Sequence, residues 1–360
     1  MADEAANREA FRIQADYCAA MDAPITARVC RVLGKCLDRA TETGRRVLDW
    51  PGEPVADALV LRLVGGLHAL HRRDVPELRY VFTGRIDDPE HVATALVHAI
   101  ARYDAELVPW LYGPPQTNEA GRSAGLMTGI LHLAARYGPR VEIMEIGSSG
   151  GLNLLIGDYG FDLGGVAVGP AEAPVRIVPE WRGAPPPDVP VTVVDARGVD
   201  RNPLDLGGAR DAERLQAYCW VDHRERVERL AHTIAMVRAR GVQLDRGDAA
   251  DWLEAQLDRP QDEGVTRVLM HSVVWQYLPE ATQQRIAAAM QRAGARATRA
   301  RPLGWVMMEP NRDQHRHEVR VRGWPGETPM QLVATTHAHG AWVEGLTPPY
   351  PTRPYVMRAY

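Results

Sequence analysis

Hydrophobic positions recur every three or four residues along the first part of the chain, as in helices that bury one face. No strand is expected before Val141, and prolines and glycines separate the helical stretches. We therefore predict a helical N-terminal cap domain over residues 1–138. The stretches that carry the pattern are residues 11–21, 25–40, 55–73, 89–103 and 118–137.

The pattern changes after residue 138, where short apolar runs alternate with helical stretches. This alternation is typical of a mainly parallel sheet with helices on both faces. Two later segments, residues 317–324 and 331–343, suit a final antiparallel hairpin, and the Gly- and Pro-rich stretch 160–190 predicts a hairpin or loop. The second domain, residues 139–360, is thus predicted to be α/β. Its apolar runs are residues 141–147, 189–195, 242–248, 265–275 and 302–310.

Composition and charge narrow the functional classes. The 360 residues are 45% hydrophobic and 24% charged, as in an ordinary globular protein, and the formal net charge is −4. A negative charge gives no general attraction to nucleic acids or anionic membranes, so we expect neither as a partner. Lys35 is the only lysine and lies far from any glycine-rich turn, which disfavours a Walker loop and pyridoxal chemistry.

Other features bear on location. The acidic start MADEAANREAF is unlike a signal peptide, and no uncharged apolar run reaches about 18 residues. The four cysteines form no CxxC pair, which indicates reduced thiols. We expect a cytoplasmic protein.

The segment VEIMEIGSSGGLNLL, residues 141–155, is the candidate ligand-binding turn. An apolar strand ends at Glu145, turns through small residues and enters a helix whose first amides are free for a ligand. A dinucleotide fingerprint GxGxxG fits poorly, because Ser149 and Leu152 replace two of its glycines. The same residues satisfy GxSxG, which makes Ser149 a candidate hydrolase nucleophile, although the helical region upstream is unlike that of α/β-hydrolases.

A third interpretation is the first motif of class I methyltransferases, [DE]xGxGxG. Glu145, Gly147, Ser149 and Gly151 match it with one serine in place of glycine. Residues without bulky side chains let the methionine part of S-adenosylmethionine lie against the backbone, and the carboxylate receives its ammonium directly or through water. A tight turn that binds no ligand remains the alternative.

Acidic residues follow the later strands in the order that this motif predicts. VVDARGVDRNP offers Asp195 and Asp200, with Asn202 nearby, as acceptors for the ribose hydroxyls, and its GVDRNP context favours Asp200. VQLDRGDAADWL places Asp248 and Ala249 where the adenine amino group is expected. Each aspartate also has a local alternative as a turn or helix-capping residue.

The segment VTRVLMHSVVWQYLPEATQQRI resembles the fourth strand and exit loop of class I methyltransferases. By this resemblance His271 and Ser272 line the cofactor, while Trp275, Gln276 and Tyr277 face the substrate. The alternative assigns these side chains to the core or the surface.

The QTNE segment precedes a helix that leads to the first strand. Thr117 or Asn118 is expected to cap this helix, and Arg122, one turn in, to bind the carboxylate of the cofactor or a neighbouring carboxylate. His339, followed by Gly340, is expected to border the substrate pocket. Two HxH pairs together with Glu309 offer a metal site only as an alternative, and we expect no metal. These pairs are His315 with His317 and His337 with His339.

Six longer motifs run through nearly the whole chain. They are FRIQA from Phe11, QTNEAGRS from Gln116, EIGSSGGLNLL from Glu145, GVDRNPLD from Gly198, CWVDHRERVERL from Cys219 and HSVVWQYL from His271. With these motifs the chain resembles a bacterial domain-of-unknown-function family. The resemblance implies a methyltransferase-like fold and no settled reaction.

Together these patterns predict a class I methyltransferase-like (Rossmann-like) α/β domain with an N-terminal helical domain. We expect methyl transfer from S-adenosylmethionine to a small molecule, with His271, Tyr277 and Glu309 as candidates for a general base. A serine hydrolase that uses Ser149 and a non-catalytic protein that binds the cofactor or a related nucleoside stay open. The residues expected to bind the cofactor are Thr117, Asn118, Arg122, Glu145, Gly147, Ser149, Gly151, Asn153, Asp195, Asp200, Asn202, Asp248, Ala249, His271 and Ser272.

Overall fold

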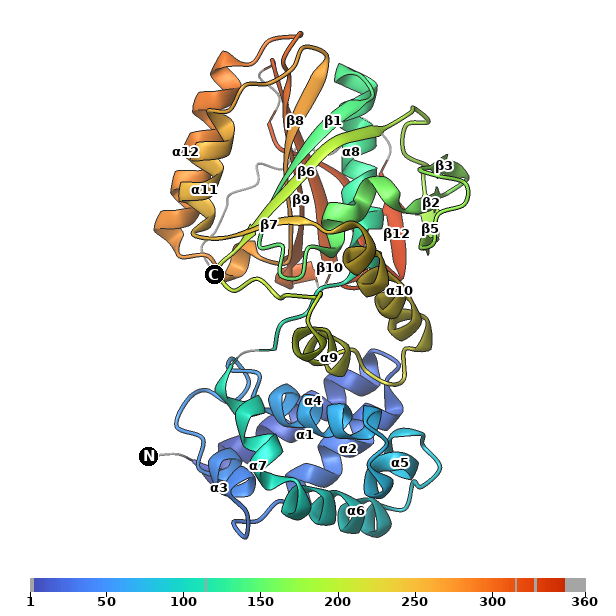
Figure 1. Cartoon of the computed structure of the whole chain (residues 1–360), viewed down its shortest axis with the longest axis vertical. Coiled ribbons are helices and arrows are strands. Elements are labelled where there is room, and N and C mark those ends of the chain that lie inside the picture. The colour runs from blue at the N-terminus through green and yellow to red at the C-terminus, as the bar shows by residue number, and fades with distance from the viewer. Residues whose placement is uncertain (1–2, 114, 315, 327–328, 347–360) are drawn as a thin grey trace. The chain divides into compact units, whose positions relative to one another are not determined.

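The chain divides into two compact units (Figure 1). The computed structural model describes residues 3–113, 115–314, 316–326 and 329–346. The first unit contains residues up to 117 together with 208–231, and the second contains residues 118–207 and those from 232 onward.

The first unit is helical. Side chains at the N-termini of α1, α3 and α6 satisfy backbone amides that the helices leave free: Asp3, Thr41 and Asp88 each accept from an amide of the helix that follows. The helices are α1 (Glu4–Ala20), α2 (Pro24–Cys36), α3 (Glu42–Leu48), α4 (Leu59–Arg72), α5 (Pro76–Phe82), α6 (Pro89–Arg102), α7 (Asp104–Leu107), the 3-10 helix η1 (Val108–Tyr112), α9 (Ala209–Ala217) and the first part of α10 (Arg224–Arg240).

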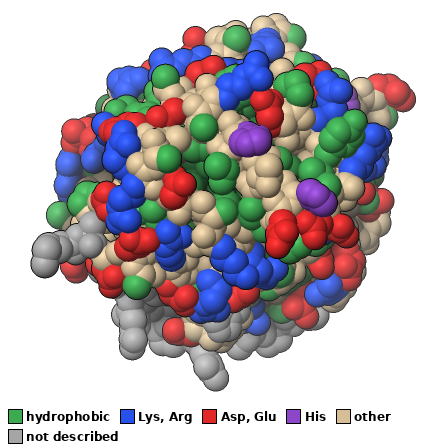
Figure 2. All heavy atoms as spheres, turned by 90° about the horizontal axis from the view of Figure 1, so that it is seen from below, with side chains coloured by type: hydrophobic (Ala, Val, Ile, Leu, Met, Phe, Trp, Pro, Cys, Tyr) green, Lys and Arg blue, Asp and Glu red, His purple; other side chains and the backbone are tan. Residues whose placement is uncertain are grey.

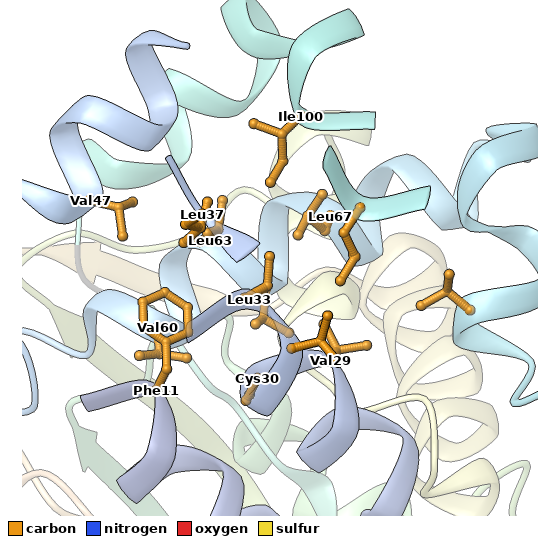
Figure 3. Packing of buried hydrophobic residues seen from close by; sticks show 14 of the residues in the cluster. Phe11, Val29, Cys30, Leu33, Leu37, Val47, Val60, Leu63, Leu67 and Ile100 are labelled. Carbon is orange, nitrogen blue, oxygen red and sulfur yellow. The ribbon is translucent and has the colours of Figure 1, made fainter. Parts of the chain in front are cut away.

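One apolar core holds these helices together. Phe11 of α1, Leu33 of α2 and Leu63 of α4 are fully buried and lie in one cluster (Figure 3). The cysteines are free thiols, and two of them, Cys18 and Cys30, are buried in the same cluster. The predicted period of three to four residues thus corresponds to the buried faces of real helices.

Residues 208–231 join the first unit through specific polar contacts. The Nδ1 atom of His68 in α4 lies 2.9 Å from the carbonyl oxygen of Ala217 in α9. The Asp222 carboxylate accepts from the amides of Ile25 and Thr26 and from the Thr26 hydroxyl, at 2.7, 3.2 and 2.6 Å. Asp222 therefore caps α2 from about two hundred residues away in sequence.

The second unit contains a nine-stranded sheet in the order β5-β12-β11-β10-β9-β8-β1-β6-β7. A small sheet, β3-β2-β4, lies in the predicted insert. The strands are β1 (Arg140–Ile146), β2 (Gly160–Leu163), β3 (Val166–Val168), β4 (Arg176–Ile177), β5 (Glu180–Gly183), β6 (Thr192–Asp200), β7 (Gln243–Arg246), β8 (Val265–Ser272), β9 (Leu303–Asn311), β10 (Arg316–Trp324), β11 (Gln331–Thr336) and β12 (Trp342–Gly345).

Strands β7, β6, β1, β8 and β9 are all parallel, and their places in the chain give the order 3-2-1-4-5. The chain reverses its direction of winding between β1 and β8, and ligands of such sheets bind beyond the carboxyl ends of the strands at this point. Strands β10, β11 and β12 continue the sheet as an antiparallel meander.

Helices cover both faces of the sheet (Figure 1). Helix α8 contacts β8 to β11, where Gly129 of the helix lies against Val306. On the other face α11 and α12 enclose a cluster that contains Met144, Trp305 and Trp324. The remaining helices of this unit are α8 (Ser123–Tyr137), α11 (Ala249–Leu257), α12 (Glu280–Arg296) and the 3-10 helices η2 (Ala120–Arg122), η3 (Leu152–Asp158), η4 (Trp275–Tyr277) and η5 (Arg312–Gln314).

Several elements differ from the expectations. Residues 118–138, assigned to the helical cap, lie in the second unit because α8 packs on the sheet. The predicted strand 331–343 is two strands, β11 and β12, with a turn between them, and the predicted helix after the glycine-rich turn is the 3-10 helix η3. Within the described residues, no helix is both long enough and apolar enough to cross a bilayer.

Candidate functional site

The candidate site lies where β1 ends, beside β6 and β8. Gly147, Ser149 and Gly151 have φ values of +69°, +53° and +75°, so three residues of the turn are left-handed. Serine adopts this conformation at some energetic cost, of order 1–2 kcal/mol, because its Cβ approaches the following carbonyl group. The turn after Glu145 is therefore partly strained, as turns at ligand sites often are.

Most backbone amides of this turn are already bonded within the protein. The amides of Gly147 and Ser148 donate to the Val199 carbonyl at 2.9 and 3.1 Å, and that of Ser149 donates to Asp200 Oδ2 at 2.8 Å. The amide of Gly151 donates to the Ser148 carbonyl at 2.8 Å. These bonds fix the shape of the turn and leave side-chain atoms as its main free polar groups.

Close packing within the protein explains the glycines at positions 147 and 151. A Cβ atom added to Gly147 would collide with the side chain of Val274, and one added to Gly151 would lie 3.0 Å from Val242. The expected space for a cofactor beside these two residues is thus filled by valine side chains. A larger residue at Gly147 would disturb this packing directly.

Glu145 is the most unusual group of the site. Its carboxylate is fully buried, Oε1 accepts from the Asn153 side-chain amide at 2.9 Å, and the Asn153 oxygen accepts from the Ser123 hydroxyl at 2.9 Å. Burial raises the pKa of Glu145 to about 7, against the lowering effect of the Asn153 bond and of nearby Arg122.

Two side-chain oxygens at this turn have no hydrogen-bond partner among the described residues: Oε2 of Glu145 and Oγ of Ser149, both buried. Buried polar atoms are normally bonded, and an unbonded one costs about 1–3 kcal/mol. A donor group supplied by a ligand would satisfy both. The unbonded hydroxyl also means that, within the described chain, no histidine is paired with Ser149 as a hydrolase would require.

The two aspartates of β6 have different positions. Asp200 ends the strand at the carboxyl edge, where its oxygens accept from the amides of Ser149 and Asn202, both at 2.8 Å. Asp195 pairs in register with Glu142, in the other half of β1, and forms an ion pair with Arg197 at 2.8 Å. The structure therefore brings Asp200 to the turn and leaves Asp195 away from it, while the exposed Asn202 side chain accepts from Arg246 at 3.1 Å.

Asp248 and Ala249 begin α11 after β7. Oδ1 of Asp248 accepts from the amides of Ala250 and Asp251 at 2.9 and 3.3 Å, the bonds of an N-cap. The local alternative for Asp248 is thus observed, and its second oxygen lies 3.5 Å from Arg201. Ala249 is partly exposed beside it.

The QTNE segment contributes one residue to the turn in an unexpected way. Asn118 caps η3 instead of α8, because its Oδ1 accepts from the Leu152 amide at 3.0 Å. Arg122 is buried and donates to the Ala338 carbonyl at 3.0 Å, while its charge acts on Glu145. Thr117 is exposed and is the last residue of the first unit, so its predicted role at the turn has no observed contact.

His271, the last residue but one of β8, lies in a closed hydrogen-bond network. Its Nδ1 lies 2.6 Å from Glu309 Oε1, and its Nε2 lies 3.0 Å from the indole nitrogen of Trp305. Because an indole N–H only donates, Nε2 accepts and Nδ1 carries the proton. His271 is fully buried, and both of its ring nitrogens are hydrogen-bonded within the protein, one of them to Glu309.

Glu309 keeps one free atom. Its Oε1 also accepts from the Val274 amide at 3.2 Å, whereas Oε2 is buried without a partner among the described residues. Val273, just before this contact, has a φ of +54°, which is rare for a β-branched residue. Glu309 thus holds a strained loop through Oε1 and leaves Oε2 without a partner among the described residues.

The remaining exit-loop residues separate into core and surface. Trp275 is buried and stacks on His271 with ring centroids 5.1 Å apart, so it belongs to the core. Gln276 accepts from Arg312 at 2.9 Å, and Tyr277 is 73% exposed. Ser272 is buried at the end of β8. The loop therefore presents Gln276 and Tyr277 outward, without a contact that marks either as catalytic.

The late histidines lie in the turn between β11 and β12. The ring centroids of His337 and His339 are 5.4 Å apart and the rings meet edge to face, and neither residue lies in a strand. Within the ranges that the structure describes, no three His, Cys, Asp or Glu side chains converge as metal ligands would. His315 lies outside those ranges.

Two residues that carry the site were not predicted from the sequence. Ser123 orients Asn153, and Trp305 fixes the tautomer of His271. Ser123 lies in the long QTNEAGRS motif, which could have marked it as a site residue. Trp305 is one apolar residue among many in its strand, so the sequence did not distinguish it.

Comparison with protein-family models matches residues 8–344 to one family, described as "Uncharacterized protein conserved in bacteria (DUF2332)". No curated protein matches the chain. The match spans almost the whole sequence and agrees with the bacterial domain-of-unknown-function family that the motifs indicated. The chain therefore belongs to this bacterial family.

Proposed function

We propose that the chain is an S-adenosylmethionine-dependent methyltransferase of the class I (Rossmann-like) type that acts on a small molecule. The observation that carries the proposal is the buried carboxylate of Glu145 at the end of the first strand of a 3-2-1-4-5 sheet, because its Oε2 has no partner in the part of the chain that the structure describes. An ammonium group is the natural partner for such an oxygen, because a buried carboxylate is stabilised by a bonded cation.

The neighbouring residues fit the same ligand in part. Ser149, in the same turn, offers a second oxygen without a partner among the described residues. The Asp200 oxygens, although each accepts an amide, have further lone pairs for hydroxyl donors. Gly147 and Gly151 do not reserve space for it. The fit therefore depends on the carboxylates at the strand ends more than on the glycines.

When bound, S-adenosylmethionine supplies an activated methyl group. The residues of this chain would then bind and orient the acceptor and hold its proton. Glu309 is the remaining candidate for proton acceptance, since its Oε2 is unbonded among the described residues while His271 and Val274 hold Oε1.

A small acceptor suits the charge of the chain. The net charge is −4, and on the face in Figure 2 arginine and acidic side chains are interspersed with hydrophobic ones. Nucleic acid would require a surface dominated by positive charge.

The proposal is tested by calorimetric titration of the full chain with S-adenosylmethionine and S-adenosylhomocysteine. Glu145→Gln should weaken binding of both by roughly tenfold or more, since a bond to a charged partner contributes about 1.5–3 kcal/mol. Glu344→Gln, at an exposed glutamate of β12, is the matched control and should bind as the parent does. Folded protein that binds neither ligand would refute the proposal.

The serine hydrolase alternative has one observation in its favour, the strained backbone of Ser149 in a strand-turn-helix segment. A fluorophosphonate probe separates the two functions. Labelling that disappears in Ser149→Ala would establish a nucleophilic serine, whereas a methyltransferase leaves the probe unreacted.

A further inference from the structure

The helical unit contains a cavity of its own, with a volume of about 580 Å³. The end of α4, the end of α5, the start of α2 and the first turns of α10 surround it, and every lining residue belongs to the first unit. Sites for small molecules usually have volumes of about 300–1,000 Å³. The cavity is therefore large enough for a ligand of drug or metabolite size.

Three nearly parallel rings form one wall, which we call the ring wall: His68, His71 and Phe82. Phe82 lies 5.4 and 5.2 Å from the two imidazole centroids, which are 6.0 Å apart, and all interplanar angles are near 20°. These distances are those of one phenyl ring placed over two imidazoles that lie side by side. A wall of this kind favours a flat aromatic ligand.

The imidazoles of the ring wall are uncharged at neutral pH. Burial lowers the pKa of His68 to about 4 and lowers that of His71 below its ordinary value. His68 donates from Nδ1 to the Ala217 carbonyl, whereas Nδ1 of His71 is buried and has no partner in the described part of the chain. A polar atom on the ligand would satisfy this nitrogen.

Charges of both signs lie around the same cavity. Arg72 and Arg224 supply positive charge, and Asp22 and Glu228 supply negative charge. Among the described residues no ion pair involves Asp22, Arg224 or Glu228. Burial lowers the pKa of Arg72, whose Nη2 donates to the neutral Gln216 side chain at 2.7 Å. An anionic group on a ligand would therefore stabilise Arg72.

Asp222 also lines the cavity but is committed to structure. Its two oxygens accept three hydrogen bonds from Ile25 and Thr26 at the start of α2. This cap holds the wall of the cavity in place. The charged groups of a ligand would therefore pair with the other four charged residues, which are Asp22, Arg72, Arg224 and Glu228.

We propose that this cavity binds an aromatic zwitterion, of the class of the aromatic α-amino acids. The aromatic ring lies against the ring wall, the carboxylate pairs with Arg72 and Arg224, and the ammonium pairs with Asp22 and Glu228. The site is separate from the turn after Glu145, so this proposal does not depend on methyl transfer.

The test uses the full chain and four indole compounds that carry both charges, one charge or none: L-tryptophan, tryptamine, indole-3-propionate and indole. Calorimetric titration should give the tightest binding for L-tryptophan, with each missing charge weakening binding roughly threefold to tenfold, as partly exposed ion pairs do. Failure of all four compounds to bind would overturn the proposal.

Two charge variants test the assigned contacts. Arg224→Gln should weaken binding of L-tryptophan and indole-3-propionate and leave tryptamine unchanged. Glu228→Gln should weaken binding of L-tryptophan and tryptamine and leave binding of indole-3-propionate unchanged. Equal losses for all compounds in both variants would contradict the assignment.

A third pair of variants locates the binding. Thr83 is exposed at the cavity and its hydroxyl donates to the Arg79 carbonyl at 2.8 Å. Thr83→Trp should place a bulky ring in the cavity and weaken binding. Thr94→Trp is the control, since Thr94 is exposed on α6, makes the same kind of bond to Glu90 at 2.9 Å and does not line the cavity. Unchanged binding to Thr83→Trp would overturn the proposal.

Discussion

Replacement of Glu145 by glutamine should change how the stability of the protein depends on pH. In the folded state burial raises the pKa of this carboxyl group from 4.5 to about 7. Between these two values the folded protein binds more protons than the unfolded chain, so the free energy of unfolding falls as pH rises. Above about pH 7 the carboxyl group is charged in the folded state as well, and the full cost of burying this charge lowers the free energy of unfolding.

The structure gives the size of this effect. A shift of about 2.5 pKa units corresponds to about 3 kcal/mol, because each unit is worth 1.36 kcal/mol. Glutamine has nearly the same shape and no charge to bury. Its amide can still accept from Asn153, so the network with Ser123 is retained.

Urea unfolding of the parent and of Glu145→Gln, measured without ligand between pH 4 and 8, provides the test. The unfolding free energy of the variant should rise by about 3 kcal/mol relative to that of the parent as pH rises through this range. Most of this change should occur between pH 5 and 7. Other titrating groups are common to both proteins, so their effects cancel in the difference. A difference between the two proteins that is independent of pH would refute the reasoning.

Three further predictions concern strain, capping and buried histidine. Val273→Asn should raise the unfolding free energy by about 1 kcal/mol in urea titrations, because asparagine tolerates the left-handed backbone at this position. Asp222→Ala should lower it by about 2 kcal/mol, since three donors of α2 lose their acceptor; unchanged stability would contradict the capping role. Because of His68, the unfolding free energy of the parent should fall by about 3 kcal/mol as pH falls from 6.5 to 4, since the unfolded histidine takes up a proton that the buried one does not. His68→Gln should show a correspondingly smaller loss in the same pH series.

Local patterns in the sequence were sufficient for most of the fold. Strand β1 and the turn after it were predicted because an apolar run ends at one acidic residue among small ones. Helix periods located α1, α2, α4 and α6 and missed the short helices α3, α5 and α7. The assignment of residues 208–231 to the first unit was not predictable, because it depends on contacts such as that of Asp222 with Thr26, 196 residues apart.

Sequence patterns grouped the residues of the turn whose contacts are local, and they did not show the contacts made by distant residues. Glu145 and Asn153 are eight residues apart, and both belong to the turn. His271 was expected to act on substrate, but Trp305 and Glu309, more than thirty residues later, occupy its two nitrogens. The GVDRNP context favoured Asp200 over Asp195, and the strand register agrees, because β6 ends at Asp200 while Asp195 pairs with Glu142.

Proton release on binding tests the central claim most directly, because it reports whether a ligand ammonium meets Glu145. S-adenosylhomocysteine is titrated into the protein at pH 6.5 in two buffers of different ionisation enthalpy. An ammonium beside Glu145 would lower its pKa, so the parent should release roughly three quarters of a proton, while Glu145→Gln should release almost none. Equal proton release by both proteins, or no binding by the parent, would contradict the account.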